Sequence, residues 1–137
     1  MQFLNDKDKV LIIDFGSQVT KLIARRIRDL GVYSEIITPK ELVKLKNYQN
    51  IKGLVLSGGP STVTKENFQS IPKKIFEKKI PVLGICYGLQ LIAKIFGGKI
   101  KPSKKRREFG RAFLFNRQNS ILTKNFFNSK KSVWMSH

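Results

Sequence analysis

Apolar and polar positions along the first thirty residues predict a strand followed by a helix. Residues 10–15 (VLIIDF) form a nearly continuous apolar run rich in β-branched side chains, which is typical of a strand buried on both faces. Apolar residues then recur at helical spacing from Val19 to Leu30, with basic residues between them. Gly31 follows, and a glycine at this place usually ends a helix.

The same alternation continues as far as residue 96. Strands that alternate with helices favour a parallel sheet covered on both faces, so we expect a three-layer α/β/α fold. The last helix of the series is apolar on nearly every side, which predicts that it is packed deep inside. The further predicted strands are residues 32–37, 53–57 and 82–85, and the further predicted helical segments are residues 41–45, 71–78 and 89–96.

The pattern changes after Gly97 and Gly98, because helical spacing is no longer present. Short strands are predicted at residues 99–101, 110–115 and 132–135, and we expect them to form an antiparallel extension of the sheet. A chain of 137 residues is long enough to bury a core and has the size of one domain.

The stretch 81–90 (PVLGICYGLQ) carries the most informative chemistry of the chain. A short strand runs through a sharp turn into a helix, and Cys86, the only cysteine, lies at the turn between Gly84 and Gly88. This is the cysteine form of a nucleophile elbow, in which the glycines leave room for a tight turn. The helix that follows directs its positive end toward the sulfur and favours the thiolate.

A thiolate at an elbow attacks carbonyl carbon, and the oxyanion that forms needs hydrogen-bond donors. The backbone N–H of Tyr87 is one candidate donor, and the glycine loop Gly58–Gly59, stiffened by Pro60, is the candidate source of a second. Gln90, one turn after the cysteine, can face the same crevice and bind a polar substrate.

The three loops that leave the strand ends should converge. Residues 14–18, residues 57–61 and the Cys86 turn each follow a predicted parallel strand. In parallel sheets the chemistry gathers at the carboxyl ends of the strands. The sequence therefore predicts one crevice that contains all three loops.

Composition and charge narrow the remaining possibilities. No apolar run reaches the length needed to span a bilayer, residues 1–9 lack the apolar core of a secretory signal, and a single cysteine excludes an intrachain disulfide. We expect a cytoplasmic protein without membrane contact. The net charge of +18 raises the alternative of a non-catalytic basic binding module. The densest basic cluster, residues 101–107, contains no aromatic residue for base stacking, so we do not expect a nucleic-acid partner.

Six motifs together resemble one known family over residues 9–137. They resemble the class I glutamine amidotransferase domain of the glutamine-hydrolysing GMP synthases. The elbow alone would specify only the amidotransferase class, whereas the first-strand loop and the Trp-Met-Ser-His ending point to the GMP synthase branch. The motifs are DFGSQ at 14–18, LIARR at 22–26, SGGPS at 57–61, PVLGICYG at 81–88, REFG at 107–110 and VWMSH at 133–137.

The resemblance implies a Rossmann- or flavodoxin-like fold and a glutaminase. Cys86 would attack the side-chain amide of glutamine and release ammonia, which a synthetase domain or subunit would use to convert XMP to GMP. No cofactor or metal is implied in this chain, whereas ATP and Mg would serve the synthetase. The implied oxyanion-hole amides are those of Gly59 and Tyr87, and the implied substrate-binding residues are Gly58, Gly59, Gln90, Ser136 and His137.

One part of the family pattern is absent from the 137 residues. The family completes its catalytic triad with a His-Pro-Glu segment, and the sole histidine here, His137, matches an earlier motif. We therefore expect residues 1–137 to be a single glutaminase domain that is incomplete at its C-terminus, without the ATP pyrophosphatase region and with weak activity or none. Another cysteine-elbow hydrolase stays open as an alternative.

Overall fold

The computed structural model describes residues 7–63, 68–101, 109–115, 120–124 and 130–136. Contacts within the chain define two compact units, residues 1–101 and residues 102–137, and each is treated by itself below. The single domain predicted for residues 1–137 stays a prediction.

The first unit is built on a four-stranded sheet in the order β2-β1-β3-β4, with every neighbouring pair parallel. Strand and helix alternate along the chain as predicted, although the segment before β4 is a 3-10 helix (η1). The strands are β1 Lys9–Ile13, β2 Ser34–Ile37, β3 Ile51–Leu56 and β4 Val82–Gly84, and the helices are α1 Thr20–Asp29, α2 Pro39–Lys44, η1 Lys73–Lys78 and α3 Tyr87–Ile95.

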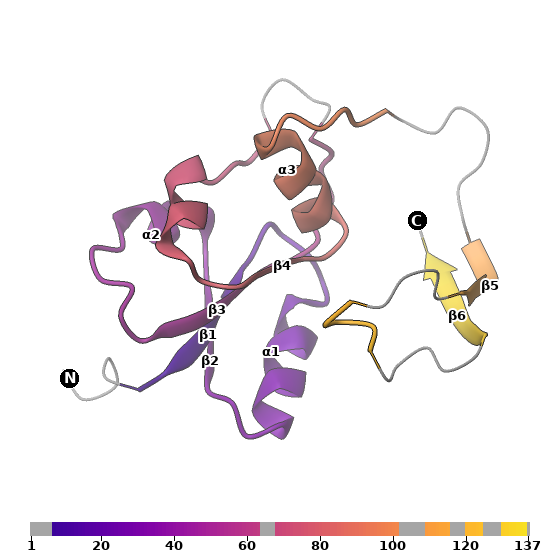
Figure 1. Ribbon diagram of the computed structural model, residues 1–137, viewed down its shortest axis with the longest axis horizontal. Helices are drawn as coiled ribbons and strands as arrows, with labels where there is room; N and C mark the ends of the chain where they lie inside the picture. The colour runs from indigo at the N-terminus through magenta and orange to yellow at the C-terminus, as the bar shows by residue number, and fades with distance from the viewer. Residues whose placement is uncertain (1–6, 64–67, 102–108, 116–119, 125–129, 137) are drawn as a thin grey trace. The chain divides into compact units, whose positions relative to one another are not determined.

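Helices cover both faces of this sheet, with α1 on one side and α2 and α3 on the other (Figure 1). The reason is that the chain moves outward from β1 to β2 and then returns across β1 to β3 and β4. Right-handed crossovers in opposite directions place their helices on opposite faces. Ile12 packs in the cluster that contains Ala24 of α1, whereas Leu11 packs in the cluster of Leu42 and Leu91. The predicted three-layer α/β/α fold is confirmed.

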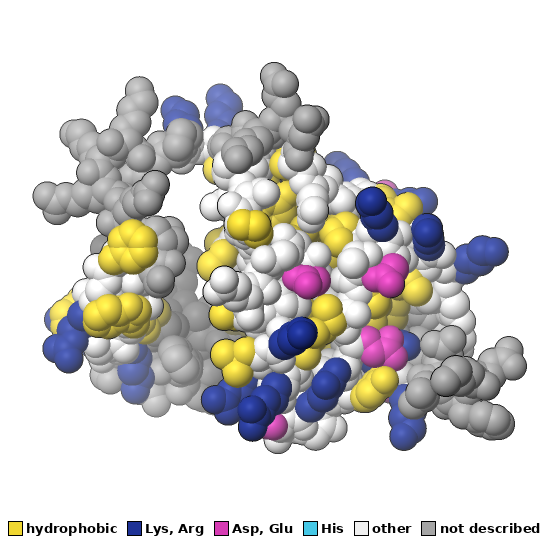
Figure 2. Space-filling view, turned by 180° about the vertical axis from the view of Figure 1, so that it is seen from behind, with side chains coloured by type: hydrophobic (Ala, Val, Ile, Leu, Met, Phe, Trp, Pro, Cys, Tyr) yellow, Lys and Arg dark blue, Asp and Glu magenta, His cyan; other side chains and the backbone are white. Residues whose placement is uncertain are grey.

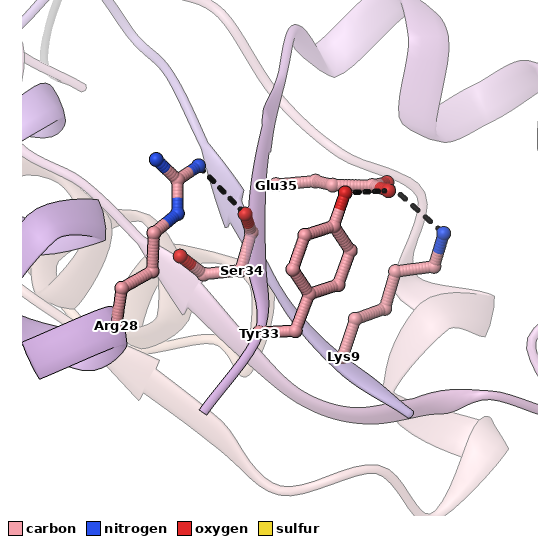
Figure 3. A network of polar contacts seen from close by, with 5 residues as sticks. All are labelled: Lys9, Arg28, Tyr33, Ser34 and Glu35. Atoms are coloured by element: carbon pink, nitrogen blue, oxygen red, sulfur yellow. Dashed lines mark hydrogen bonds and ion pairs between the residues drawn. The ribbon is translucent and has the colours of Figure 1, made fainter. Parts of the chain in front are cut away.

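Polar contacts fasten the outer strand β2 to its neighbours (Figure 3). The Lys9 side chain is almost fully buried, and its ammonium lies 3.0 Å from a carboxylate oxygen of Glu35. The Tyr33 hydroxyl donates to the other oxygen of that carboxylate at 3.1 Å. Arg28 of α1 donates to the carbonyl of Ser34 at 2.8 Å. A buried lysine is tolerated here because it is paired.

Helix α3 is less buried than its apolar sequence predicted. Leu89 and Phe96 are 59% and 58% exposed, and of the residues in the helix only Tyr87, Gly88 and Leu91 are buried. The prediction of a deeply packed helix is therefore wrong. The physical reason is that α3 lies in an outer layer, so that only the stripe facing the sheet is covered.

The second unit contains a two-stranded antiparallel sheet of β5 Phe109–Leu114 and β6 Lys131–Ser136. Antiparallel pairing in this region is confirmed, but two details of the prediction are wrong. Residues 99–101 form no strand. In the described part of the chain β5 and β6 pair with each other and do not extend the four-stranded sheet. Each of these strands pairs along its full length with the other, over Phe109–Leu114 and Lys131–Ser136. The antiparallel ladder thus forms between two segments of the second unit itself.

Basic side chains do not form a single patch on the face of the first unit that Figure 2 shows. Lys and Arg are spread over this face, with Asp and Glu between several of them. Of the basic cluster at 101–107, residues 102–107 lie outside the described residues. Within the part of the chain that is described, no helix has the length and apolar character required to cross a membrane.

Candidate functional site

Cys86 lies between the end of β4 and the start of α3, as predicted for an elbow. It is exposed, and its φ of 50° and ψ of −108° lie in a region that residues with a side chain seldom adopt. Backbone strain of this kind is held in place by the surrounding structure and occurs at functional sites. The residue occupies the N-cap position of α3, and its side chain makes no capping hydrogen bond.

The two glycines that flank Cys86 are required by close packing. A Cβ atom on Gly88 would lie 2.2 Å from the carbonyl oxygen of Leu56 in β3, and one on Gly84 would lie 2.7 Å from the Leu89 nitrogen. The Gly88 N–H donates to the Ser57 carbonyl at 3.1 Å. The start of α3 is therefore pressed directly onto the end of β3.

The predicted convergence of the three loops is confirmed. A Cβ atom built on Gly58 would lie 3.6 Å from the Cys86 Cβ atom and 3.5 Å from the Ser17 hydroxyl. On Gly59 it would lie 2.6 Å from the carbonyl oxygen of Phe15. The first-strand loop, the glycine loop and the elbow thus meet at the carboxyl end of the sheet. At this point the chain leaves β1 toward β2 on one side and leaves β3 toward β4 on the other.

Two backbone N–H groups beside the cysteine are free, within the described part of the chain, to donate hydrogen bonds to an oxyanion. Tyr87 is the first residue of α3, and helix geometry leaves its N–H without an intrahelical acceptor. Neither this N–H nor that of Gly59 donates a hydrogen bond to a described residue. The Cys86 sulfur likewise makes no hydrogen bond to a described residue.

The Tyr87 side chain is buried and connects the elbow to two neighbouring segments. The ring is 3% exposed and packs on Phe15 with 5.0 Å between ring centroids, and its hydroxyl donates to the carbonyl of Gln69 at 2.5 Å. Burial raises the pKa of this hydroxyl above its ordinary value of 10.0, because the phenolate would lose its hydration.

The free energy of unfolding of a Tyr87→Phe variant is expected to be about 1 kcal/mol lower at neutral pH, since the variant loses one hydrogen bond. Because the pKa of the Tyr87 hydroxyl is higher in the folded than in the unfolded chain, the protonated hydroxyl stabilises the fold at pH values below 10. This stabilisation is lost as the pH rises through the folded-state pKa. The advantage of the unsubstituted chain should therefore shrink above pH 10. Urea unfolding from pH 8 to pH 11 measures this, and parallel curves for the two proteins would contradict it.

Gln90 follows Cys86 by one helical turn, and its backbone N–H donates to the Cys86 carbonyl at 3.1 Å. The side-chain oxygen Oε1 is buried and has no hydrogen-bond partner among the described residues. A buried acceptor without a donor is costly, so this atom favours a ligand that brings an N–H group.

The other candidate residues are only partly within view. Ser136 is the last residue of β6 and pairs with Phe109, but its side chain is outside the described structure. His137 lies outside the described residues. Among the described residues no group of three or more His, Cys, Asp or Glu side chains could hold a metal ion.

Sequence reasoning missed a buried polar network beneath the glycine loop. Ser57 and Thr20 are 0% and 1% exposed. The Thr20 hydroxyl donates to Asp14 at 2.9 Å and lies 3.3 Å from the Ser57 hydroxyl. The available signal was that Asp14 and Ser57 lie at or near the ends of predicted strands and that Thr20 opens the helix after the first strand, where parallel topology brings them together.

Comparison with known proteins agrees with this geometry. A model of the glutamine amidotransferase class-I family matches residues 11–137. A GMP synthase [glutamine-hydrolyzing] of Fusobacterium nucleatum is 47% identical over 132 residues, which are 96% of this chain and 25% of the relative. The corresponding protein of Bartonella henselae is 50% identical over 138 residues, which are 98% of this chain and 26% of that relative. The chain thus spans about a quarter of the length of these curated relatives.

Solved structures show the same likeness. A Thermoplasma acidophilum protein assigned as one subunit of a GMP synthase superposes with a TM-score of 0.66 at 29% identity, over 92% of this chain and 62% of that one. A glutamine amidotransferase from Methylobacillus flagellatus shares the fold, with a TM-score of 0.70 at 18% identity over 96% and 56% of the two chains. With the family match over residues 11–137, the chain belongs to the class-I glutamine amidotransferase family.

Proposed function

We propose that this chain is the glutamine-hydrolysing part of a GMP synthase, with Cys86 as its nucleophile. The observation that carries the proposal is the strained, exposed cysteine at an elbow directly beside the glycine loop. Among the alternatives, another cysteine-elbow hydrolase would share that geometry, but the family match supports an amidotransferase.

The reaction follows from the groups at the elbow. The Cys86 thiolate attacks the amide carbon of the glutamine side chain, and the carbonyl oxygen becomes an oxyanion that the Gly59 and Tyr87 amides stabilise. Collapse of this intermediate breaks the C–N bond, and the nitrogen takes up a proton and leaves as ammonia. Water then hydrolyses the glutamyl thioester to glutamate and restores the thiol.

The substrate would be held by polar groups around the crevice. The Gln90 Oε1 atom, which has no partner among the described residues, can accept a hydrogen bond from an N–H group of glutamine. Gly58 has no side chain and so allows the substrate to approach the loop closely. Ser136 and His137 are proposed as further substrate contacts on the motif resemblance alone.

The ammonia would be used by a synthetase domain or subunit that binds ATP and Mg and aminates XMP to GMP. This part of the proposal rests on the relatives, which are named as glutamine-hydrolysing GMP synthases and are about four times as long as this chain. No cofactor is proposed for the 137 residues themselves. A nucleophilic thiol must stay reduced, which supports a cytoplasmic location.

The 137-residue chain alone is expected to hydrolyse glutamine slowly, well below the roughly 1 s⁻¹ at the lower end of ordinary enzymes. Its sequence contains no His-Pro-Glu segment, and no described residue hydrogen-bonds the Cys86 sulfur to act as base. The measurement is glutamate release, with and without added imidazole as an external base.

Imidazole should raise the rate of the unsubstituted chain and leave Cys86→Ala at background. Turnover at ordinary enzymatic rates without imidazole would contradict the missing base. Equal rates for the two chains under every condition would contradict the assignment of Cys86.

A further inference from the structure

We propose that Ser57 is a positioning residue that holds the Gly58–Gly59 peptide in the orientation the oxyanion hole needs. Ser57 directly follows β3 and is completely buried. Its hydroxyl donates to the carbonyl of Gly58 at 3.0 Å and accepts from the Phe15 N–H at 3.3 Å. The hydroxyl therefore links the first-strand loop to the glycine loop.

The hydrogen bond to the Gly58 carbonyl determines where the Gly59 N–H points. The two groups belong to one peptide plane, and the chain contains no cis peptide among its described residues. In a trans peptide the C=O and N–H groups point in opposite directions. Because Ser57 draws the carbonyl toward the buried network, the N–H of Gly59 is turned away from that network and left without a protein acceptor among the described residues.

This orientation needs a restraint because it lies between two glycines. A peptide flanked by glycines can rotate with little steric resistance, since neither neighbour has a Cβ atom. A rotation that released the carbonyl would carry the N–H away from its anion-binding direction. The hydroxyl is the described side-chain contact that opposes this rotation.

The surrounding network determines the direction in which the Ser57 proton is donated. A serine hydroxyl has one proton, and the Phe15 N–H already occupies a lone pair of its oxygen. Thr20 lies 3.3 Å away, but its own proton has a closer acceptor in Asp14 at 2.9 Å. The Gly58 carbonyl is the nearest remaining acceptor for Ser57, and the burial of Ser57, Thr20 and Gly58 makes the arrangement costly to break.

The proposal rests on the proposed glutaminase function, so its test must separate the two. The probe is 6-diazo-5-oxo-L-norleucine, a glutamine analogue whose ketone oxygen would occupy the place of the amide oxygen. The diazo carbon takes up the thiol proton, the sulfur bonds to that carbon, and the C–N bond breaks with loss of N₂. Methyl methanethiosulfonate is the reference reagent, because it forms a disulfide with Cys86, releases methanesulfinate and has no carbonyl.

Ser57→Ala is expected to lower the rate of Cys86 modification by the diazoketone about tenfold or more. Removing an oxyanion donor outright costs about 10²–10³, and a misdirected donor should cost less. The rate with methyl methanethiosulfonate should stay within about twofold, since that reaction does not use the hole. A folded Ser57→Ala chain that reacts with the diazoketone at the unsubstituted rate would overturn the proposal, and so would an equal loss with both reagents.

Ser34→Ala is the matched control for removing a buried serine hydroxyl. Ser34 is also 0% exposed and donates to the Ala24 carbonyl at 3.1 Å, but it lies on β2 outside the site. Its variant should react with both reagents as the unsubstituted chain does, and a tenfold loss with the diazoketone would overturn the proposal.

Ser57→Cys provides a second route if Ser57→Ala does not fold, because it nearly keeps the shape of the side chain but replaces the hydroxyl with a thiol, which is a weak donor. A loss of about two- to fivefold in labelling of the Cys86 peptide by the diazoketone alone is expected, and an unchanged rate would overturn the proposal in that case. Failure of the unsubstituted chain to react with the diazoketone would instead contradict the glutaminase function itself.

Discussion

A Gly88→Ala chain is expected to lose about 3 kcal/mol of unfolding free energy, at the upper end of overpacking effects. The added methyl group would lie 2.2 Å from the Leu56 carbonyl oxygen and 2.6 Å from the Leu56 Cβ atom. The nearest contact is backbone, so no side-chain rotation can relieve it, and α3 must move away from β3. A total stability of about 5–15 kcal/mol would fall to about 2–12 kcal/mol, so a domain at the low end of that range would be close to unfolding at body temperature.

Gly31→Ala separates this packing effect from the general cost of replacing a glycine. Gly31 has a φ of 78°, but a Cβ atom there would meet nothing within 4 Å. Its variant should lose about 1 kcal/mol from backbone strain alone. Urea unfolding followed by circular dichroism measures both, and equal losses for the two variants would contradict the close contact of α3 with β3.

Cys86→Ala is expected to abolish modification by the diazoketone while leaving the fold intact. The side chain is exposed, so its truncation removes little packing. Alanine keeps a Cβ atom at a φ of 50° and therefore keeps the strain of the elbow, whereas glycine releases it. Cys86→Gly should thus be more stable than Cys86→Ala by about 1 kcal/mol, within the usual range for such backbone strain.

Thermal and urea unfolding of the two variants give this comparison, with diazoketone labelling of both as the chemical readout. A Cys86→Gly chain less stable than Cys86→Ala would mean that the elbow is not strained. Labelling that persists in either variant would place the reactive nucleophile elsewhere in the chain.

The sheet and the elbow could be predicted from the sequence because local patterns determine them. The apolar run before Gly84 and the helical spacing after Cys86 confine the cysteine to a turn, whatever surrounds it. Convergence of the loops then follows from parallel topology. Parallel topology could also have predicted that Thr20 lies near Ser57. The local sequence pattern around either residue gives no sign of that contact.

Other features depend on long-range packing that no local pattern contains. The apolar sequence of α3 could not show that only the side of Leu91 meets the sheet. The hydrogen bond from Ser57 to Gly58 likewise depends on a backbone orientation that the sequence SGG permits but does not impose.

The most direct test of the central claim is mass spectrometry of the chain after reaction with 6-diazo-5-oxo-L-norleucine, in the presence of L-glutamine or L-asparagine. The elbow geometry predicts one adduct, on the peptide that contains Cys86, whose formation L-glutamine slows and L-asparagine does not. Adducts at other residues, or labelling of Cys86 that L-glutamine leaves unchanged, would contradict Cys86 as the glutamine-directed nucleophile.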